Sequence, residues 1–348
     1  MPAPRKKVRV VIADDSLVAR EMLAQILASD PLIEVVGQAV NGMEAVELVE
    51  RLRPDLVTMD IHMPKMDGLA ATERIMAFTP TPILVVSSSV YGEGMGRAFD
   101  ALKLGALEVI KKPEPRDWAD LERIGKEVLR KVKVLANVRV ITHIGGRRER
   151  RGATTSQATI SSANRDIVAI GSSTGGPSAL LTIFEALPAD LPVPILVAQH
   201  IADGFVPGLV TWLDASTKVK VVAAEEGVIP RPGTVYIAPT GANLVLSGKR
   251  LAFSVPLKSQ LYVPCADELF DSVASSYHQR AVGVILTGMG ADGAQGLRRL
   301  HGTGAATIAQ DEESCTVFGM PKAAIELGAA DAVLPLGAIG AAIVELVG

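Results

Sequence analysis

Three side chains in the second half of the sequence are of the types that perform nucleophilic catalysis. Ser173 lies in the turn Gly171-Ser172-Ser173-Thr174-Gly175, which fits the pattern GxSxG. His200 follows the apolar run PILVAQ, and Asp292 follows VGVILTGMGA. An imidazole can remove the proton of a serine hydroxyl, and a carboxylate can orient that imidazole and stabilise its cation. The three residue types therefore predict acyl transfer, provided that the fold brings them together.

Other interpretations of this turn are open on the sequence alone. A P-loop needs Gly-Lys-Ser/Thr, and a dinucleotide-binding turn needs GxGxxG with an acid closing the next strand, so phosphate binding is disfavoured here. A serine or threonine of the turn could instead cap the following helix. Asp203 competes with Asp292 because it is close to His200 in sequence. The glycine-rich LTGMGADG has backbone amides free to face a developing oxyanion.

A second group of polar side chains follows apolar runs in the first half of the sequence. Asp14 and Asp15 end the first run, and Asp60 ends the third. Like charges at one sheet edge favour a bound cation, and oxygen ligands in small number suit Mg²⁺. Ser87 ends the fourth run and Lys112 ends the fifth, so both can reach the same edge and bind the charge of a phosphorylated aspartate. The alternative is that the paired aspartates are helix N-terminal carboxylates and Lys112 is a surface residue.

The elements that must position these side chains form two α/β series. In the first, the apolar runs VRVVIA, IEVVGQA, DLVTMD, PILVVS and EVIKK alternate with helical stripes, and Asn41 with Glu44 resembles a capping box. The second contains IVAI, PILVA, AVGVIL, AATIA and DAVLP. Such alternation predicts two doubly wound parallel sheets covered on both faces. The turn-rich segment from Lys218 to Val255 predicts short antiparallel strands inserted into the second domain.

Composition bounds the class of protein. A chain of 348 residues, 48% of them hydrophobic, is long enough for two cored domains, and we predict boundaries at 1–115, 116–165 and 166–348. The middle segment is a helix followed by the basic GGRRERRG and a Ser/Thr-rich linker. The net charge of −3 argues against general nucleic-acid binding. Cys265 and Cys315 have neither disulfide nor metal spacing and are expected as core thiols of a cytoplasmic protein without signal peptide or membrane insertion.

The first domain resembles a known family. ADDS, MDIHMPKMDG, VVSSS and GALEVIKKP closely resemble the receiver domain of two-component response regulators, over nearly all of residues 7–115. The resemblance implies a flavodoxin-like fold with Asp60 as phosphoacceptor and Ser87 and Lys112 as switch residues. It also implies Mg²⁺ held by the acidic pocket and by one backbone carbonyl: Asp14, Asp15, Asp60 and the carbonyl of His62. Many receivers carry a switch aromatic where this chain has Val109, so a rotamer switch of that ring is not expected.

The second domain resembles the catalytic domain of the chemotaxis-receptor methylesterases. IGSSTGG, VAQHIADGF, YIAPTGANL, ILTGMGADGA and AQDEESCTVFGMP carry the resemblance. It implies Ser173 as nucleophile, His200 as general base, Asp292 as its orienting acid and the Met289 backbone N–H as an oxyanion donor. Family members often have histidine at Asn243, a departure that bears on substrate fit.

The two resemblances together imply a phosphorylation-activated enzyme. It would hydrolyse glutamate γ-methyl esters on methyl-accepting chemoreceptors and deamidate receptor glutamines, with a chemotaxis histidine kinase as phosphodonor and Mg²⁺ needed only for phosphorylation. The unphosphorylated receiver would cover the crevice at Ser173. One alternative is a non-enzymatic response regulator whose second domain binds a receptor or kinase. Another is a nucleotide-binding output domain, for which the lysine or ribose-binding acid is missing.

Overall fold

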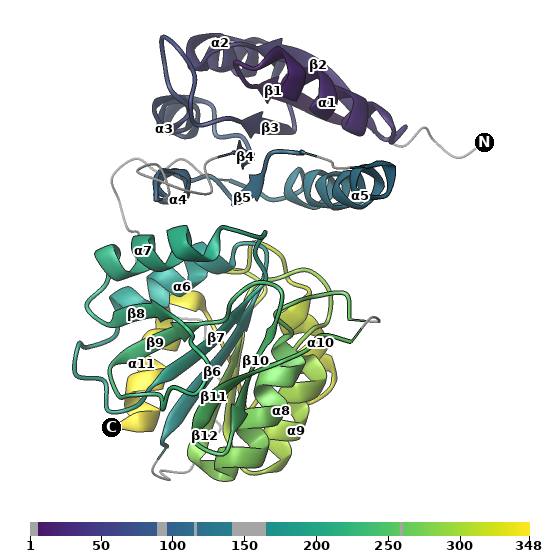
Figure 1. Ribbon diagram of the computed structural model, residues 1–348. Coiled ribbons are helices and arrows are strands. Elements are labelled where there is room, and N and C mark those ends of the chain that lie inside the picture. The colour runs from purple at the N-terminus through teal and green to yellow at the C-terminus, as the bar shows by residue number, and fades with distance from the viewer. Residues whose placement is uncertain (1–5, 89–95, 115–116, 141–164, 258–259) are drawn as a thin grey trace. The chain divides into compact units, whose positions relative to one another are not determined.

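The chain forms two compact units, Met1–Glu149 and Arg150–Gly348. The computed structural model describes residues 6–88, 96–114, 117–140, 165–257 and 260–348 (Figure 1). The basic and Ser/Thr-rich linker predicted from the sequence lies largely outside these ranges. No helix in the described ranges has the length and apolar character needed to cross a bilayer.

The first unit is built on a five-stranded sheet in the order β2-β1-β3-β4-β5, and every pairing is parallel. The five predicted strands are therefore confirmed. Its elements are β1 (Val8–Ala13), α1 (Leu17–Ala28), β2 (Ile33–Ala39), α2 (Gly42–Leu52), β3 (Leu56–Met59), α3 (Gly68–Phe78), β4 (Ile83–Ser87), α4 (Arg97–Lys103), β5 (Glu108–Lys111) and α5 (Trp118–Leu135).

Helix α5 carries the apolar stripe that the sequence places just after the first sheet. Its residues Val128, Val132 and Leu135 are buried in one cluster with α1 and with β1, β4 and β5. Figure 1 shows α1 and α5 lying together on one side of the sheet. The predicted boundary at residue 115 assigns this helix to the linker, whereas its side chains pack in the core of the first unit. Asn41 caps α2, because its Oδ1 accepts from the Glu44 N–H at 3.0 Å, and the Glu44 carboxylate accepts from the Val40 N–H at 3.1 Å, one residue before the cap.

The second unit has a seven-stranded sheet in the order β14-β13-β12-β6-β7-β9-β8, again with every pairing parallel. Its elements are β6 (Ile167–Ser172), α6 (Gly176–Glu185), β7 (Ile195–Gln199), α7 (Val206–Ser216), β8 (Lys220–Ala223), β9 (Thr234–Ile237), β10 (Asn243–Ser247), β11 (Arg250–Ser254), α8 (Ala266–Tyr277), β12 (Ala281–Ile285), α9 (Ala294–Gly302), β13 (Ala306–Gln310), α10 (Met320–Glu326), β14 (Ala332–Leu334) and α11 (Leu336–Val347).

The predicted antiparallel insertion is smaller than expected. Only β10 and β11 form an antiparallel pair, with Asn243 opposite Ser254 and Ser247 opposite Arg250. The earlier strands β8 and β9 pair in parallel and extend the main sheet. A short strand between turn residues has the same sequence pattern whether it pairs in parallel or antiparallel. The direction of pairing depends on the partner strand, which can be distant in sequence. The expectation of antiparallel strands was therefore wrong for β8 and β9 and is confirmed for the hairpin.

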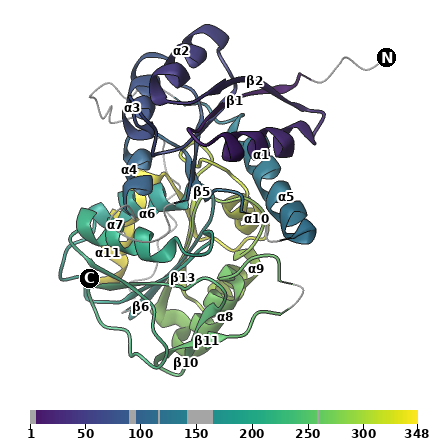
Figure 2. The ribbon, with the colours of Figure 1, turned by 45° about the horizontal axis from the view of Figure 1, so that its top comes forward.

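Both faces of the second sheet are covered. Helices α8, α9 and α10 and the β10–β11 hairpin share one apolar cluster with the sheet. Figures 1 and 2 show α6, α7 and α11 on the opposite side. Because all strands run the same way, their carboxyl ends form a single edge, where ligands and catalytic groups gather in open α/β sheets.

Candidate active site and phosphorylation site

The serine turn begins where β6 ends, next to the ends of two other strands. Ser172 is paired with Gln199 at the end of β7, and Gly171 is paired with Ile285 at the end of β12. The Ser173 N–H donates to the Thr287 carbonyl oxygen at 3.0 Å. The fold therefore brings the ends of these three strands to one place, as the sequence predicts.

The hydroxyls of the turn have different surroundings. The Ser172 side chain is fully buried and donates to Gln199 Oε1 at 2.6 Å. The N-cap of α6 is Gly175, at φ +77°, and no side chain caps the helix. The interpretation of the turn as a serine or threonine cap is therefore wrong for this helix. Ser173, which is 6% exposed, is left as the candidate nucleophile at the centre of GxSxG.

Gln199 holds the serine turn to the histidine, and sequence reasoning missed this role. Its Nε2 donates to the Ser173 carbonyl at 2.9 Å and to the His200 carbonyl at 2.8 Å. A Cβ on Gly176 would lie only 2.0 Å from Gln199 Oε1, so the approach requires glycine. The sequence did contain a signal for this role, because a polar amide is the last residue of an otherwise apolar strand. A buried amide must have hydrogen-bond partners.

His200 and Asp292 form a direct pair. His200 Nε2 lies 2.7 Å from Asp292 Oδ2, whereas the rival Asp203 is exposed to solvent. The other ring nitrogen, Nδ1, is buried and has no hydrogen-bond partner among the described residues. The Tyr262 ring stacks on the imidazole, with ring centroids 4.6 Å apart and planes inclined by 1°. The carboxylate and the tyrosine together restrict the orientation of the His200 ring.

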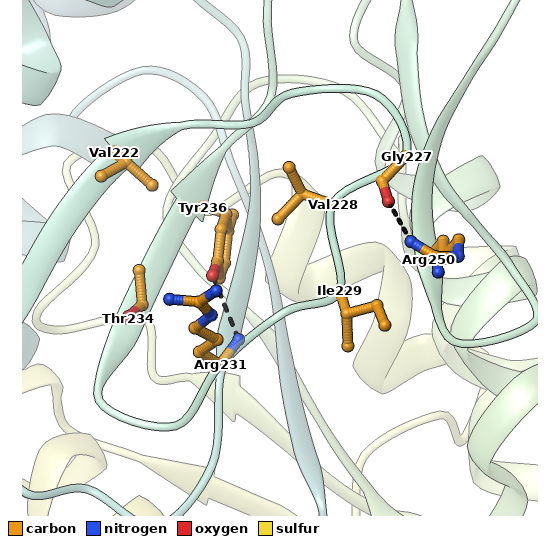
Figure 3. Close-up of a pocket in the computed structure, with 8 residues that line it drawn as sticks. All are labelled: Val222, Gly227, Val228, Ile229, Arg231, Thr234, Tyr236 and Arg250. Atoms are coloured by element: carbon orange, nitrogen blue, oxygen red, sulfur yellow. Dashed lines mark hydrogen bonds between the residues drawn. The ribbon is translucent and has the colours of Figure 1, made fainter.

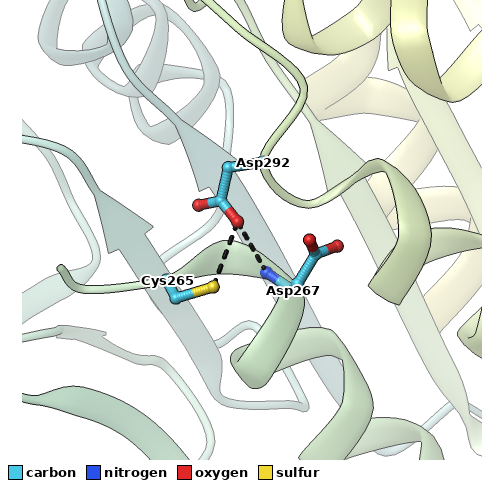
Figure 4. A group of neighbouring side chains, drawn as sticks. All are labelled: Cys265, Asp267 and Asp292. Carbon is cyan, nitrogen blue, oxygen red and sulfur yellow. Dashed lines mark hydrogen bonds between the residues drawn. The ribbon is translucent and has the colours of Figure 1, made fainter. Parts of the chain in front are cut away.

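Asp292 is itself held by the N-terminal end of α8. Its Oδ2 accepts from the Ala266 N–H at 2.7 Å, and its Oδ1 accepts from the Asp267 N–H at 3.2 Å and from the Cys265 thiol at 3.1 Å. Figure 4 shows the thiol and the Asp267 N–H converging on the carboxylate. Burial by itself would raise the pKa of Asp292, but the bonds from His200 and these donors hold it below its usual value. The group therefore stays ionised and ready to stabilise an imidazolium.

The same residues form a cluster of possible metal ligands, Cys265, Asp267 and Asp292. Burial next to Asp292 raises the pKa of the Cys265 thiol to about 12, so the sulfur is a protonated hydrogen-bond donor in this structure. The Asp292 oxygens already accept from backbone and thiol donors. The cluster serves to hold a carboxylate. Both cysteines are free, in line with the expectation of thiols without a disulfide.

The expected oxyanion donor lies close to the serine turn. A Cβ on Gly288 would lie 2.7 Å from Ser173 Cβ, so the chain just before Met289 packs directly against the turn. Within the described ranges, the Met289 N–H donates to no protein acceptor. The N-terminus of α6 begins three residues after Ser173, and the positive end of its dipole favours negative charge there. These features suit a site where a carbonyl oxygen becomes an oxyanion.

Asn243 stands where members of the resembled family often have histidine, and in this structure its side chain is buried and hydrogen-bonded. It is 1% exposed, and its Oδ1 accepts from the Cys265 N–H at 2.9 Å. Its Nδ2 donates to Gln260 Oε1 at 3.1 Å. Asn243 therefore fixes the segment that leads through Tyr262 and Cys265 into α8.

The first unit brings its acidic side chains together at the carboxyl ends of its strands. Ala13 is paired with Met59, which sets Asp14 beside Asp60. Lys112 Nζ lies 2.8 Å from Asp14 Oδ2 and 3.0 Å from Asp60 Oδ2. The buried Ser87 ends β4, and its carbonyl accepts from the Lys112 N–H at 3.0 Å. The alternative of a surface lysine is therefore wrong for Lys112.

The donor set of this site fits a divalent cation. Carboxylate oxygens of Asp14, Asp15 and Asp60 lie within 4.8 Å of one another, with Asp15 exposed and the other two buried. Burial raises the pKa of Asp60, and the charge of Asp14 adds to this, with Lys112 only partly offsetting it. Such crowded carboxylates gain from a cation that takes oxygen ligands. The side chain of His62 is exposed, in keeping with its expected contribution through the backbone only.

A shallow concavity elsewhere in the second unit contains none of these residues. It has a volume of about 650 Å³ and lies against Val222, Val228, Ile229, Tyr236 and two arginines (Figure 3). Arg250 donates to the Gly227 carbonyl at 2.8 Å, and Tyr236 Oη accepts from the Arg231 N–H at 3.1 Å. Because Ser173, His200 and Asp292 do not line it, this concavity is separate from the candidate active site.

Comparison with known proteins agrees with the geometry. The family described as response regulator receiver domain matches residues 10–121, and the family described as CheB methylesterase matches residues 168–343. A protein-glutamate methylesterase/protein-glutamine glutaminase of Anaeromyxobacter dehalogenans is 46% identical over 343 residues, covering 98% of this chain and 97% of its own. The chain belongs to the CheB methylesterase family. It is a hydrolase fused to a receiver.

Two further relatives support the assignment to the CheB methylesterases. A protein of the same description from Myxococcus xanthus is 42% identical and covers 94% of each chain. The crystal structure of the Thermotoga maritima CheB methylesterase catalytic domain is 41% identical, covers 53% of this chain and all of its own, and gives a TM-score of 0.50.

We expect Cys265 to matter for turnover in this CheB methylesterase, as a donor to Asp292. Cys265→Ala removes the thiol, leaves Asp292 Oδ1 with a backbone donor only, and should lower kcat about three- to tenfold. Cys265→Ser keeps a donor and should stay within twofold of wild type. Steady-state hydrolysis checks both, with circular dichroism as a control for folding. Equal kcat for the two variants would show that the thiol serves only packing.

Proposed function

We propose that this protein hydrolyses glutamate γ-methyl esters on methyl-accepting chemoreceptors, releasing methanol, in chemotactic adaptation. The observation that carries the proposal is the pair of His200 and Asp292 beside the Ser173 turn, in a unit that belongs to the CheB methylesterases. A domain that only binds a receptor or kinase needs no such pair, so the non-enzymatic alternative is not favoured.

The proposed mechanism is acyl transfer through Ser173. Its Oγ attacks the γ-carbonyl carbon while His200 takes the hydroxyl proton on Nδ1, the ring nitrogen that Asp292 does not engage. The Met289 N–H and the α6 N-terminus stabilise the oxyanion. His200 then gives the proton to the departing methoxy oxygen, and methanol leaves. Water, deprotonated by His200, attacks the acyl-enzyme and restores Ser173 and a free glutamate.

The same site would accept a glutamine side chain. Its amide carbonyl has the shape of the ester carbonyl, and His200 can protonate the departing nitrogen, so that ammonia leaves instead of methanol. Deamidation is therefore the proposed second activity, and it is the activity named second in the relatives' descriptions. No cofactor is proposed for either reaction.

Phosphorylation of Asp60 by a chemotaxis histidine kinase is the proposed activating event, in the cytoplasm. Mg²⁺, held by Asp14, Asp15, Asp60 and the His62 carbonyl, would neutralise charge on the phosphoryl group. Lys112 already contacts Asp14 and Asp60 and would pair with the new phosphate oxygens, and Ser87 would donate to them. With Val109 at the usual aromatic position, the change is proposed to travel without a ring switch.

In the unphosphorylated state, the receiver is proposed to cover the Ser173 crevice. Deleting residues 1–150 should then raise the rate of methanol release severalfold over that of the unphosphorylated full chain. Without the receiver there is no covered form of the enzyme, so every molecule has an accessible Ser173. Initial rates on methylated receptor membranes, at matched protein concentration, check this. An unchanged or lower rate in the truncated protein would rule out an inhibitory cover.

The first experiment on the proposed function is methanol release from methylated receptor membranes. The purified protein is supplied with Mg²⁺ and a small phosphodonor, and phosphate incorporation is measured in the same samples. We expect release that depends on protein and donor. A fully phosphorylated protein that releases no methanol would contradict the proposed substrate.

A further inference from the structure

The imidazole of His200 is held by one hydrogen bond among the described residues. Its Nε2 lies 2.7 Å from Asp292 Oδ2, and its Nδ1 is buried and has no hydrogen-bond partner there. A single bond fixes one atom of the ring and leaves the ring free to turn about the line of that bond. Proton transfer from Ser173 needs the plane of the ring to be fixed as well, because the donor and acceptor atoms must be close and aligned.

The side chain of Tyr262 supplies a second constraint on the imidazole. Its ring is stacked on that of His200, with centroids 4.6 Å apart and planes inclined by 1°. Stacking at this separation is a favourable contact, and it resists rotation of either ring. The hydroxyl end of the tyrosine lies against the backbone just after Met289, since a Cβ on Gly290 would lie 3.0 Å from Tyr262 Oη. Tyr262 therefore contacts both the candidate base and the segment of the expected oxyanion donor.

Tyr262 is itself fixed on both sides along the chain. The buried side chain of Asn243 donates through Nδ2 to Gln260 Oε1 at 3.1 Å and accepts through Oδ1 from the Cys265 N–H at 2.9 Å. Positions 260 and 265 flank the tyrosine, so these two bonds limit how far its backbone can move. The contact with His200 is therefore supported by a buried side chain that does not touch the histidine.

The same segment holds the carboxylate that pairs with His200. Asp292 accepts from the Cys265 thiol at 3.1 Å and from two backbone N–H groups at the start of α8, at 2.7 and 3.2 Å (Figure 4). Residues 262–267 thus supply the aromatic contact to the imidazole and also hold its hydrogen-bonded partner. The two constraints on the ring are set by one stretch of chain.

We infer that Tyr262 is a positioning residue of the acyl-transfer site. Its ring keeps the imidazole of His200 in the plane in which Nε2 meets Asp292 and Nδ1 is available to the Ser173 hydroxyl. This inference rests on the proposed acyl transfer through Ser173 and adds a residue to it. Tyr262 exchanges no proton and acts only through the orientation of His200. The reactivity of Ser173 should therefore depend on the presence of an aromatic ring at position 262.

The test measures the reactivity of Ser173 in the full chain, without a receptor. Tyr262→Phe keeps the ring and Tyr262→Leu removes it. Tyr277→Leu, which removes a buried tyrosine at the other end of α8, controls for a general loss of stability. Each protein, with Mg²⁺ and a small phosphodonor, is labelled with a fluorophosphonate. The rate constant and the final extent of labelling are measured separately, and the unfolding temperature is recorded.

We expect labelling of Tyr262→Leu to be about five- to twentyfold slower than that of wild type and to reach the same final extent. The rates of Tyr262→Phe and Tyr277→Leu should stay within twofold of wild type, even if Tyr277→Leu unfolds at a lower temperature. A slow rate at full extent identifies a misplaced base, because a residue that only supports the fold would lower the fraction of protein that reacts.

Four results would overturn the inference. An unchanged rate in Tyr262→Leu would show that Asp292 alone orients His200. A lower extent at an unchanged rate would show that the tyrosine only supports the fold. Equal slowing in Tyr262→Phe would assign the effect to the hydroxyl, and equal slowing in Tyr277→Leu would assign it to general loosening. Failure of the proposed function is seen separately, as wild-type protein that is labelled at Ser173 but releases no methanol from receptors.

Discussion

Replacing Ser173 with alanine is expected to lower methanol release from methylated receptors by about 10³-fold or more, as loss of an activated nucleophile does in serine hydrolases. The hydroxyl makes no hydrogen bond among the described residues, and alanine keeps the Cβ that packs near Gly288, so the variant should fold normally. His200 and Asp292 would remain paired at Nε2 but would have no hydroxyl to activate.

Ser172→Ala is the matched control, because it removes a hydroxyl from the adjacent position of the same turn. The Ser172 hydroxyl donates to Gln199 Oε1, and losing it leaves a buried acceptor unsatisfied, at a cost of about 1–3 kcal/mol of stability. We expect a lower unfolding temperature with methanol release within tenfold of wild type. If Ser172→Ala abolished release while Ser173→Ala did not, the nucleophile would be the other serine.

Covalent labelling of the reactive serine distinguishes Ser172 from Ser173 in a second way. A fluorophosphonate probe that labels the wild type and Ser172→Ala, but not Ser173→Ala, would place the reactive hydroxyl directly. Labelling that persists in Ser173→Ala would contradict the assignment, whatever the steady-state rates. Because labelling needs only an activated serine, it stays informative even where the natural substrate docks poorly.

The positions of the candidate reacting groups could be predicted from sequence because each follows a strand. Ser173, His200 and Asp292 come soon after apolar runs whose length and flanking turn residues favour parallel strands buried on both faces, and such strands end at one edge. The same argument places Asp14, Asp60 and Lys112 together, and in the structure Lys112 contacts both carboxylates. The periodicity of apolar residues is a local property of the sequence. It was sufficient to predict the position of a side chain wherever that side chain lies at the end of a strand.

The groups that hold the site could not be predicted in this way. Gln199 and Asn243 act through side-chain hydrogen bonds to segments that periodicity does not place, such as Asn243 to Cys265, 22 residues away. The donation of the Cys265 thiol to Asp292 joins residues 27 apart. Strand β9 likewise takes its direction from β7, with which it pairs in parallel, and not from its own turn-rich neighbours. Each of these features depends on tertiary contact.

Asp60→Asn is expected to abolish both phosphate incorporation and activation by a phosphodonor. An amide cannot form the acyl phosphate, although it nearly matches the carboxylate in size and can still accept from the Ile61 N–H, as Asp60 Oδ1 does at 2.8 Å. Basal methanol release should persist, since Ser173 belongs to the other unit. The measurement is the ratio of methanol release with and without small phosphodonor and Mg²⁺, which should fall to one.

The electrostatics of the site predict a second effect of this substitution, which makes the experiment more discriminating. Burial raises the pKa of Asp60, so the ionised carboxylate is disfavoured in the folded state. The pKa of an aspartate in the unfolded chain is about 3.9. As the pH rises from there through the higher pKa of the folded state, Asp60 contributes less and less to the stability of the fold. Asp60→Asn removes this loss, and the first unit should unfold at a higher temperature than wild type at pH 7. Glu34→Gln, an equal change of charge at an exposed position on β2, should alter neither the activation ratio nor the unfolding temperature. A higher unfolding temperature of Asp60→Asn would show that the substitution has altered the acidic pocket as intended. If that protein were still activated by the phosphodonor, phosphate would have to be accepted by a residue other than Asp60.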